Sequence, residues 1–320
     1  MPGAVSLDLA FDDAQQAIHD AANQLCRDHC GDAALKAASG SFPSGPWKAI
    51  AELGVLALAT PDGEGGACEL VAAVEALGRA VFPGPLAESF CAAQLLPPRE
   101  REAVTRGAAV VSLGSPPLLA WAPAAQIFVE IEGERAFLAR PRGAVEPVET
   151  LGGEPWGRVR LERTAPLGDA RRALSLRDLA LAAYLAAAGT RLIEDAAEHA
   201  RTRRQFGRAI GEFQAVAHPL ADAWVKLGGA ATLARAAAFR FDRAGGAVPA
   251  PEAMAAAGAA RLSAARAAVG AAHVAHQVFG AIGITLEGPV FHVSRRIRQL
   301  ASDPVRDAPA RAALLAAFGL

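Results

Sequence analysis

The sequence is poor in aromatic residues and carries almost no net charge. Phe, Trp and Tyr make up 6% of the 320 residues, and the chain has a single tyrosine. The 32 Lys and Arg residues are balanced by 33 Asp and Glu residues. A partner bound chiefly through a phosphate backbone requires a basic surface, so nucleic acid is not an expected partner.

Cysteines are also scarce. The chain has four of them, Cys26, Cys30, Cys68 and Cys91, and they form no C-x-x-C pair. Cys26 and Cys30 are four residues apart in a helical pattern, which favours buried apolar side chains over a disulfide or a metal site. We therefore predict no metal centre.

Long apolar runs and a secretory leader are missing as well. Hydrophobic residues make up 52% of the chain, with alanine prominent among them. No uncharged apolar run approaches the roughly 20 residues that a membrane span requires. The first 20 residues carry Asp8, Asp12 and Asp13 but neither lysine nor arginine, whereas a secretory signal begins with positive charge. We expect a cytoplasmic protein that does not bind a membrane.

The apolar periodicity divides the chain into three parts. Residues 11–106 have apolar positions at helical spacing, separated by loops rich in Gly and Pro. Residues 108–164 have short apolar runs broken by Gly, Pro and charged residues, which is typical of strands. From Ser175 the pattern is helical and alanine-rich, with a break at residues 245–251.

We therefore predict a mainly α fold with a small β insert. Its parts are an N-terminal helical domain (1–107), an abbreviated middle β-domain (108–168) and a C-terminal helical bundle (169–320). A four-helix bundle is the simplest way to bury the alanine-rich faces of the last part.

Two blocks of sequence carry motifs. Residues 200–216 hold Arg203, then Phe206-Gly207, then a Phe-Gln-Ala-Val run. Residues 277–289 begin with Gln277, continue through a glycine-containing turn and end in Glu-Gly-Pro. Both blocks resemble the acyl-CoA dehydrogenase family, in which an Arg-x-x-Phe-Gly turn follows a long helix and a Gln-x-x-Gly-Gly-x-Gly segment comes later. The family architecture also runs from helices through a β-domain to a helical bundle.

This resemblance implies an FAD-dependent oxidoreductase that forms a 2,3-double bond in an acyl-CoA thioester and passes electrons to an electron-transfer acceptor. In the family, the residues matching Arg203 and Gln277 reach the FAD of a neighbouring subunit. A guanidinium offers a planar donor fork to a pyrophosphate, and an amide offers both a donor and an acceptor to adenine. Side chains matching Gln205 and Phe206 line the cofactor, and glycines matching Gly280 and Gly283 let the backbone approach it.

The sequence departs from the family at the catalytic base. The usual glutamate stands in a Tyr-Glu-Gly-Thr segment, and counting from Gln277 this place falls at Asp303-Pro304-Val305. Some members carry the base before the Arg-x-x-Phe-Gly turn, where counting back leads to Arg177 with Asp178 beside it. The spacing of Ser175 and Asp178 also matches a helix N-cap with an acid at its third position. We predict no catalytic residue, with Asp178 as the runner-up.

The β-segment also lacks any match to the family's Glu-Pro-x-x-Gly-Ser-Asp and Trp-x-Thr-Asn segments, which hold the flavin ring. The chain thus resembles the base-lacking subunit of the heteromeric α2β2 acyl-CoA dehydrogenases of steroid side-chain degradation. Its expected partner is a homologous subunit with the catalytic Glu, and the acyl-CoA substrate binds the assembled enzyme. Two alternatives remain open: a self-sufficient dehydrogenase with Asp178 or Asp303 as base, and a flavin-free scaffold or binding protein.

Overall fold

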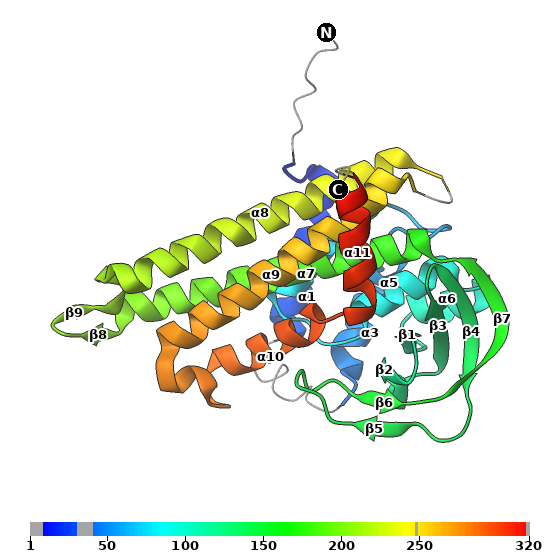
Figure 1. Cartoon of the computed structure of the whole chain (residues 1–320), viewed down its shortest axis with the longest axis horizontal. Helices are drawn as coiled ribbons and strands as arrows, with labels where there is room; N and C mark the ends of the chain where they lie inside the picture. The colour runs from blue at the N-terminus through cyan, green and yellow to red at the C-terminus, as the bar shows by residue number, and fades with distance from the viewer. Residues whose placement is uncertain (1–8, 31–40, 247–248, 318–320) are drawn as a thin grey trace, which may run out of the picture.

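The computed structural model describes residues 9–30, 41–246 and 249–317. Helices open the chain, a small β-part follows, and long helices close it (Figure 1). This order of helices, strands and helices confirms the predicted fold class. The first part comprises α1 (Asp13–His29), α3 (Ser44–Glu52), η1 (Val55–Ala57), α4 (Ala67–Arg79), α5 (Leu86–Leu95) and α6 (Pro98–Thr105).

The N-terminal helices are fixed by caps that the sequence provides. Asp12 accepts the backbone N–H of Gln15, and the Gln15 amide in turn accepts the N–H of Asp12, a reciprocal capping box at the start of α1. At the start of α4, the carboxylate of Asp242 accepts the N–H groups of Ala67 and Cys68 at 2.8 and 2.9 Å. Since Asp242 lies on α8, this cap also joins the first and last parts of the chain.

The β-part consists of two small sheets. The four-stranded sheet has the order β1-β3-β4-β7, with β1 and β3 parallel and the remaining pairs antiparallel. The three-stranded sheet has the order β2-β6-β5 and is antiparallel. The strands are β1 (Val111–Gly114), β2 (Leu118–Ala120), β3 (Ile127–Glu132), β4 (Arg135–Pro141), β5 (Glu146–Val148), β6 (Trp156–Arg158) and β7 (Leu161–Asp169).

The closing part contains three long helices that lie side by side, with two shorter helices against them (Figure 1). Small residues let the long helices approach closely: a Cβ added at Gly189 of α7 would lie 3.2 Å from the Cα of Ala268 on α9. The helices are α7 (Arg171–Thr202), α8 (Gln214–Ala244), α9 (Pro251–Phe279), α10 (Pro289–Ala301) and α11 (Pro304–Ala317). The break predicted at residues 245–251 separates α8 from α9.

The predicted cap at Ser175 is wrong. Helix α7 begins at Arg171, so Ser175 lies inside it and its hydroxyl donates to the carbonyl of Arg171 at 2.9 Å. The carboxylate of Asp169 accepts the N–H of Arg171 and thereby supports the true helix start. Asp178 is consequently more than one turn inside the helix, beyond the reach of the terminal amides.

Within the described residues, the stretch Pro251–Ile284, which contains α9, is long and apolar enough to cross a membrane by length and composition. Its buried residues are mostly alanines that belong to the main hydrophobic core, and α9 packs against α7 and α8. This is the environment of a core helix, which passes the same test as a membrane span.

Candidate functional site

The first sequence block forms a hairpin at one end of the bundle. After α7, the strands β8 (Arg204–Gln205) and β9 (Arg208–Ala209) pair around Phe206-Gly207, at the far left of the molecule in Figure 1. Both turn residues have positive φ, +51° and +82°, as a two-residue type I′ turn requires. This conformation is unusual for phenylalanine. It leaves the ring of Phe206 92% exposed.

The second block lies beside the first. Helix α9 ends at Phe279, whose ring stacks on the imidazole of His199 with centroids 4.4 Å apart. His199 is one helical turn before Arg203, and its carbonyl accepts the backbone N–H of Arg203. The stack therefore holds the α7 end that carries Arg203 against the α9 end that carries Gln277.

The predicted polar residues at this end are exposed. The side chains of Arg203 and Gln277 make no hydrogen bond or ion pair with any described residue. Gln205 is exposed as well, and within the part of the chain that the structure describes its amide donates only to the neighbouring backbone carbonyl of Arg204. These donor and acceptor groups are thus available to a molecule outside this chain.

The two predicted glycines have local structural roles. Gly280 ends α9 with φ of +60°, in the left-handed region that favours glycine. Gly283 lies in the short helix η4 (Gly280–Ile284), where an added Cβ would lie 3.1 Å from the Cβ of Phe279 and 3.4 Å from the Cα of His276. Replacing either glycine with a residue that has a side chain would disturb the turn itself, whether or not a cofactor approaches it.

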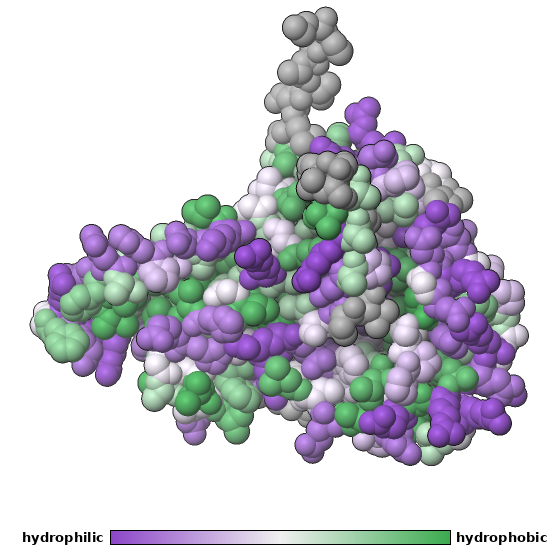
Figure 2. Space-filling view, viewed as in Figure 1, coloured by the Kyte–Doolittle hydropathy of each residue, from purple (hydrophilic) through white to green (hydrophobic). Residues whose placement is uncertain are grey.

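Apolar side chains are exposed around the same end. Besides Phe206, Ile284 and Leu286 after α9 are 70% and 65% exposed. Figure 2 shows green, hydrophobic surface at the hairpin and below it, near the turn between α9 and α10. Exposed apolar surface of this kind marks a contact area for another molecule. Ile282, in the same turn, is also exposed, and farther along α8 so are Trp224 and Val225.

The two positions to which the family spacing of the base leads, 177 and 303, lie together elsewhere, where α7 passes the junction of α10 and α11. Nη1 of Arg177 lies 2.7 Å from Oδ2 of Asp303. Burial raises the pKa of the Asp303 carboxyl, but the charge of Arg177 and its hydrogen bond outweigh burial, so this pKa lies below its usual value. Asp303 is therefore an ion-pair partner held in its charged form.

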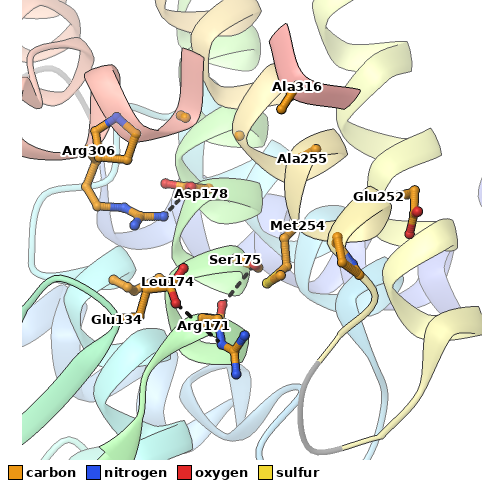
Figure 3. A pocket seen from close by; sticks show the side chains of 14 residues that line it. Glu134, Arg171, Leu174, Ser175, Asp178, Glu252, Met254, Ala255, Arg306 and Ala316 are labelled. Carbon is orange, nitrogen blue, oxygen red and sulfur yellow. Dashed lines mark hydrogen bonds and ion pairs between the residues drawn. The ribbon is translucent and has the colours of Figure 1, made fainter. Parts of the chain in front are cut away.

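Asp178, the runner-up base, is 2% exposed and paired through both oxygens. Nε of Arg261 lies 2.9 Å from its Oδ1, and Nη2 of Arg306 lies 3.2 Å from its Oδ2. Arg261 also pairs with Asp307 at 2.8 Å. These contacts connect α7 and α9 to α11, and Figure 3 shows the bond between Asp178 and Arg306 beside a pocket of about 550 Å³. Both carboxylate oxygens of Asp178 are therefore engaged by guanidinium groups of its own chain.

A second cavity, of about 380 Å³, lies between α5, α7, the β-part and the α10–α11 junction. The Arg177–Asp303 pair forms part of its wall, and Glu88 of α5 faces it. Sequence reasoning missed Glu88. The available signal was a lone carboxylate within an otherwise apolar helical run, residues 86–93, without a lysine or arginine within one turn.

Comparison with known proteins agrees with the two motif blocks. A model of the acyl-CoA dehydrogenase N-terminal domain matches residues 12–96, and a model of the C-terminal domain matches residues 167–302. Acyl-CoA dehydrogenase IpdE2 of Mycobacterium tuberculosis is 30% identical over 295 residues, covering 85% of this chain and 87% of the relative. The chain belongs to the acyl-CoA dehydrogenase family.

Further relatives and solved structures agree. IpdE2 of Mycolicibacterium smegmatis is 28% identical over 224 residues, covering 64% of this chain and 70% of the relative. The ChsE4-ChsE5 complex of Mycobacterium tuberculosis has a chain with a TM-score of 0.81 at 23% identity, with 98% of both chains covered. Butyryl-CoA dehydrogenase of Megasphaera elsdenii reaches 0.81 at 16% identity, covering 98% of this chain and all of the other. At these identities the likeness establishes the fold.

Within the described residues, no group of three or more His, Cys, Asp or Glu side chains is arranged to hold a metal ion. FAD is the cofactor that the family relationship suggests. The donor set at the hairpin end, an unpaired guanidinium beside an unpaired amide and an exposed aromatic ring, fits such a dinucleotide.

Proposed function

We propose that this chain is the base-lacking subunit of an FAD-dependent acyl-CoA dehydrogenase built from two different chains. Family membership and fold establish the general class, an oxidoreductase of the acyl-CoA dehydrogenase type. The observation that carries the proposal is the Arg177–Asp303 ion pair, because the spacing from both family motifs leads to it and it holds no free carboxylate.

Dehydrogenation of an acyl-CoA requires a group that takes the α-proton while FAD, when bound, accepts hydride from the β-carbon. Arginine is always protonated and cannot serve at position 177. Proline at position 304 has no acidic group, and Asp303 is neutralised by Arg177. Asp178 is buried between two guanidinium groups. A homologous partner with the catalytic Glu would supply the missing base.

The hairpin end would serve the partner's cofactor. Arg203 would bind the pyrophosphate, Gln277 the adenine, and Gln205 and Phe206 would line the cofactor, while Gly280 and Gly283 shape the adjoining turn. The exposure of this end and its exposed apolar surface support a subunit contact there. The β-part lacks the family's Glu-Pro-x-x-Gly-Ser-Asp and Trp-x-Thr-Asn segments, which supports a modified flavin-holding region in this chain.

The relatives suggest the substrate class and the partner. ChsE4-ChsE5 is a complex of two chains, and Tcur3481-Tcur3483, with a TM-score of 0.81 at 20% identity, is a steroid acyl-CoA dehydrogenase. By analogy we propose a bulky apolar acyl-CoA as substrate, an electron-transfer acceptor for the reduced flavin, and a cytoplasmic location.

The test is expression of this chain alone and together with the homologous dehydrogenase chain of the same organism. We expect a mixed complex with FAD absorbance and acyl-CoA oxidation, and little FAD in the chain alone. Near-stoichiometric FAD and turnover in the chain alone would select the self-sufficient enzyme instead. A colourless mixed complex would select the flavin-free scaffold.

A further inference from the structure

Arginines gather at the corner where the two small sheets meet. The chain passes from β4 through Arg142 to β5, and it passes from β6 through Val159 and Arg160 to β7. The backbone N–H of Arg142 donates to the carbonyl of Arg160 at 2.8 Å, so these two residues lie opposite each other. The β-part with this corner is at the right of Figure 1, and the hairpin of β8 and β9 is at the far left.

Arg142 and Arg160 are like charges at facing positions. The ladder of β4 and β7 places Arg140 opposite Glu162, and an ion pair joins these two at 3.0 Å. Two residues farther along the strands, Arg142 stands opposite Arg160 instead of a glutamate. Like charges directly opposite each other destabilise an antiparallel pair. An anion bound between the two guanidinium groups would remove this repulsion.

Arg158 extends the positive surface along the strand. Val159 is 2% exposed, so Arg158 and Arg160 on either side of it both point outward. Positions two residues apart on a strand are separated by about 6.5–7 Å. Arg158 is in register with Glu146 of β5, but among the described residues no ion pair joins them.

The three arginines at the corner, 142, 158 and 160, are exposed. Within residues 9–30, 41–246 and 249–317, their side chains form no hydrogen bond or ion pair. With Arg140, they are four cations beside two carboxylates, those of Glu146 and Glu162, which leaves a surplus of two positive charges. Figure 2 shows purple, hydrophilic surface at this end of the molecule. None of the three lines either of the cavities described above.

The spacing of these groups matches an extended acidic chain. A guanidinium binds a carboxylate through two parallel hydrogen bonds. In an extended segment, every second side chain points to the same side at intervals of about 6.5–7 Å, which is the separation of Arg158 and Arg160. One carboxylate therefore meets Arg158, and the next meets the facing pair of Arg142 and Arg160. A single phosphate group is matched by the facing pair alone.

We propose that this corner is a docking surface for an extended acidic segment of another protein, with Asp or Glu at alternate positions. Glu146 and Glu162 border the arginines and repel further carboxylates, so the contact takes two or three acidic residues. The proposal goes beyond the proposed function, because the corner lies far from the hairpin end and its contacts involve neither FAD nor a catalytic base.

The test compares two fluorescent peptides of equal composition, Ser-Glu-Ser-Glu-Ser-Glu-Ser and Ser-Ser-Glu-Glu-Glu-Ser-Ser. Binding to the full-length chain is measured by fluorescence anisotropy at about 0.01 M ionic strength, where charge interactions extend over about 30 Å. The alternating peptide presents all three carboxylates on one side when extended. We expect it to bind at least about threefold more tightly than the block peptide, since one exposed ion pair changes affinity by up to about fivefold.

Variants of the arginines locate the site. Arg142→Gln, Arg158→Gln and Arg160→Gln should each weaken binding of the alternating peptide by about two- to fivefold. The triple variant should bind both peptides equally. Arg240→Gln with Arg243→Gln, at two exposed positions on α8, is the control for net charge and should stay within about twofold of the parent chain. Melting curves establish that each variant is folded.

The proposal is overturned if the two peptides bind the parent chain equally, if neither binds saturably, or if the α8 control weakens binding as much as the corner variants do. Inorganic pyrophosphate at matched ionic strength is the third probe. Tighter binding of pyrophosphate than of the alternating peptide, lost in the triple variant, would make the corner a phosphate site and would also overturn the proposal. These readouts need neither flavin nor a partner subunit, so their failure is distinct from a failure of the proposed dehydrogenase subunit.

Discussion

The guanidinium of Arg177 and the carboxylate of Asp303 are ion-paired at 2.7 Å although 126 positions separate them in the chain. One was located by counting back from Arg203 and the other by counting forward from Gln277. Their contact indicates that both counts lead to one place in the fold, between α7 and the junction of α10 and α11. In this chain that place holds a neutralised pair.

We predict that neither Asp178 nor Asp303 is the dehydrogenation base. Asp178→Asn and Asp303→Asn should leave the flavin half-reaction of the assembled enzyme within about threefold, measured by stopped-flow absorbance. Loss of a general base typically costs on the order of 10²–10⁴-fold. A decrease of that size in an intact complex would make this chain catalytic.

The same substitution should have a clear effect on stability. Asp178→Asn leaves the guanidinium groups of Arg261 and Arg306 without their shared carboxylate, and breaking such a buried pair costs roughly 3–5 kcal/mol. Denaturant unfolding measures this. Asp28→Asn, at an exposed position on α1, is the control and should change the free energy of unfolding by less than about 0.5 kcal/mol. Equal stability of both variants would contradict the role of Asp178 in holding α11.

We predict that Arg203→Ala and Gln277→Ala lower FAD retention in the assembled complex. Each variant removes a polar group that has no partner among the described residues, so the unfolding of this chain should be unchanged. The loss should be roughly 1–3 kcal/mol of FAD binding for each variant, measured by flavin fluorescence during dilution. Arg201→Ala, an exposed arginine paired with Glu198, is the matched control. Full flavin occupancy in both variants would exclude the assignment.

Much of the fold could be predicted because its signals are local. Helical spacing, short apolar runs and the break at residues 245–251 separate the three parts without knowledge of their packing. The residues of the hairpin end could be named because each motif is a short contiguous segment. Their meeting depends on the His199–Phe279 stack, which joins two helices and has no signature in either segment.

The remaining features depend on tertiary packing. The spacing of Ser175 and Asp178 fits a capping box, but the helix starts earlier, at Arg171. Ser175 is therefore an interior helix residue that donates to the carbonyl of Arg171, and Asp178 is a buried ion-pair residue. Glu88 looks like an ordinary helix residue until α7 and the β-part enclose it. Such residues are identified by what surrounds them.

We predict that acid weakens the contact between the ends of α7 and α9. Burial, and then the charge of Arg203, lowers the pKa of His199 below its usual value. The folded state therefore binds fewer protons than the unfolded state between that lowered pKa and about 6.5, and stability falls as pH drops through this window. His199→Phe retains a stacked ring and removes the titration. Its melting temperature should fall less than that of the parent between neutral pH and pH 5, and an equal fall in both would contradict the assignment.

The last prediction separates the turn conformation of Phe206 from the exposure of its ring. Phe206 and Gly207 both have positive φ, and Asn-Gly is the preferred pair for such a type I′ turn, so Phe206→Asn should keep the hairpin without destabilising the chain. If the ring is covered in the complex, its loss removes apolar burial worth roughly 1.5–3 kcal/mol, or about tenfold or more in affinity. We expect unchanged melting of the isolated chain and weaker assembly or FAD retention in the mixed complex. Trp224→Asn, on the exposed side of α8, tests whether the effect is confined to the hairpin. Assembly and flavin content equal to the parent in Phe206→Asn would show that the exposed ring is not part of the contact.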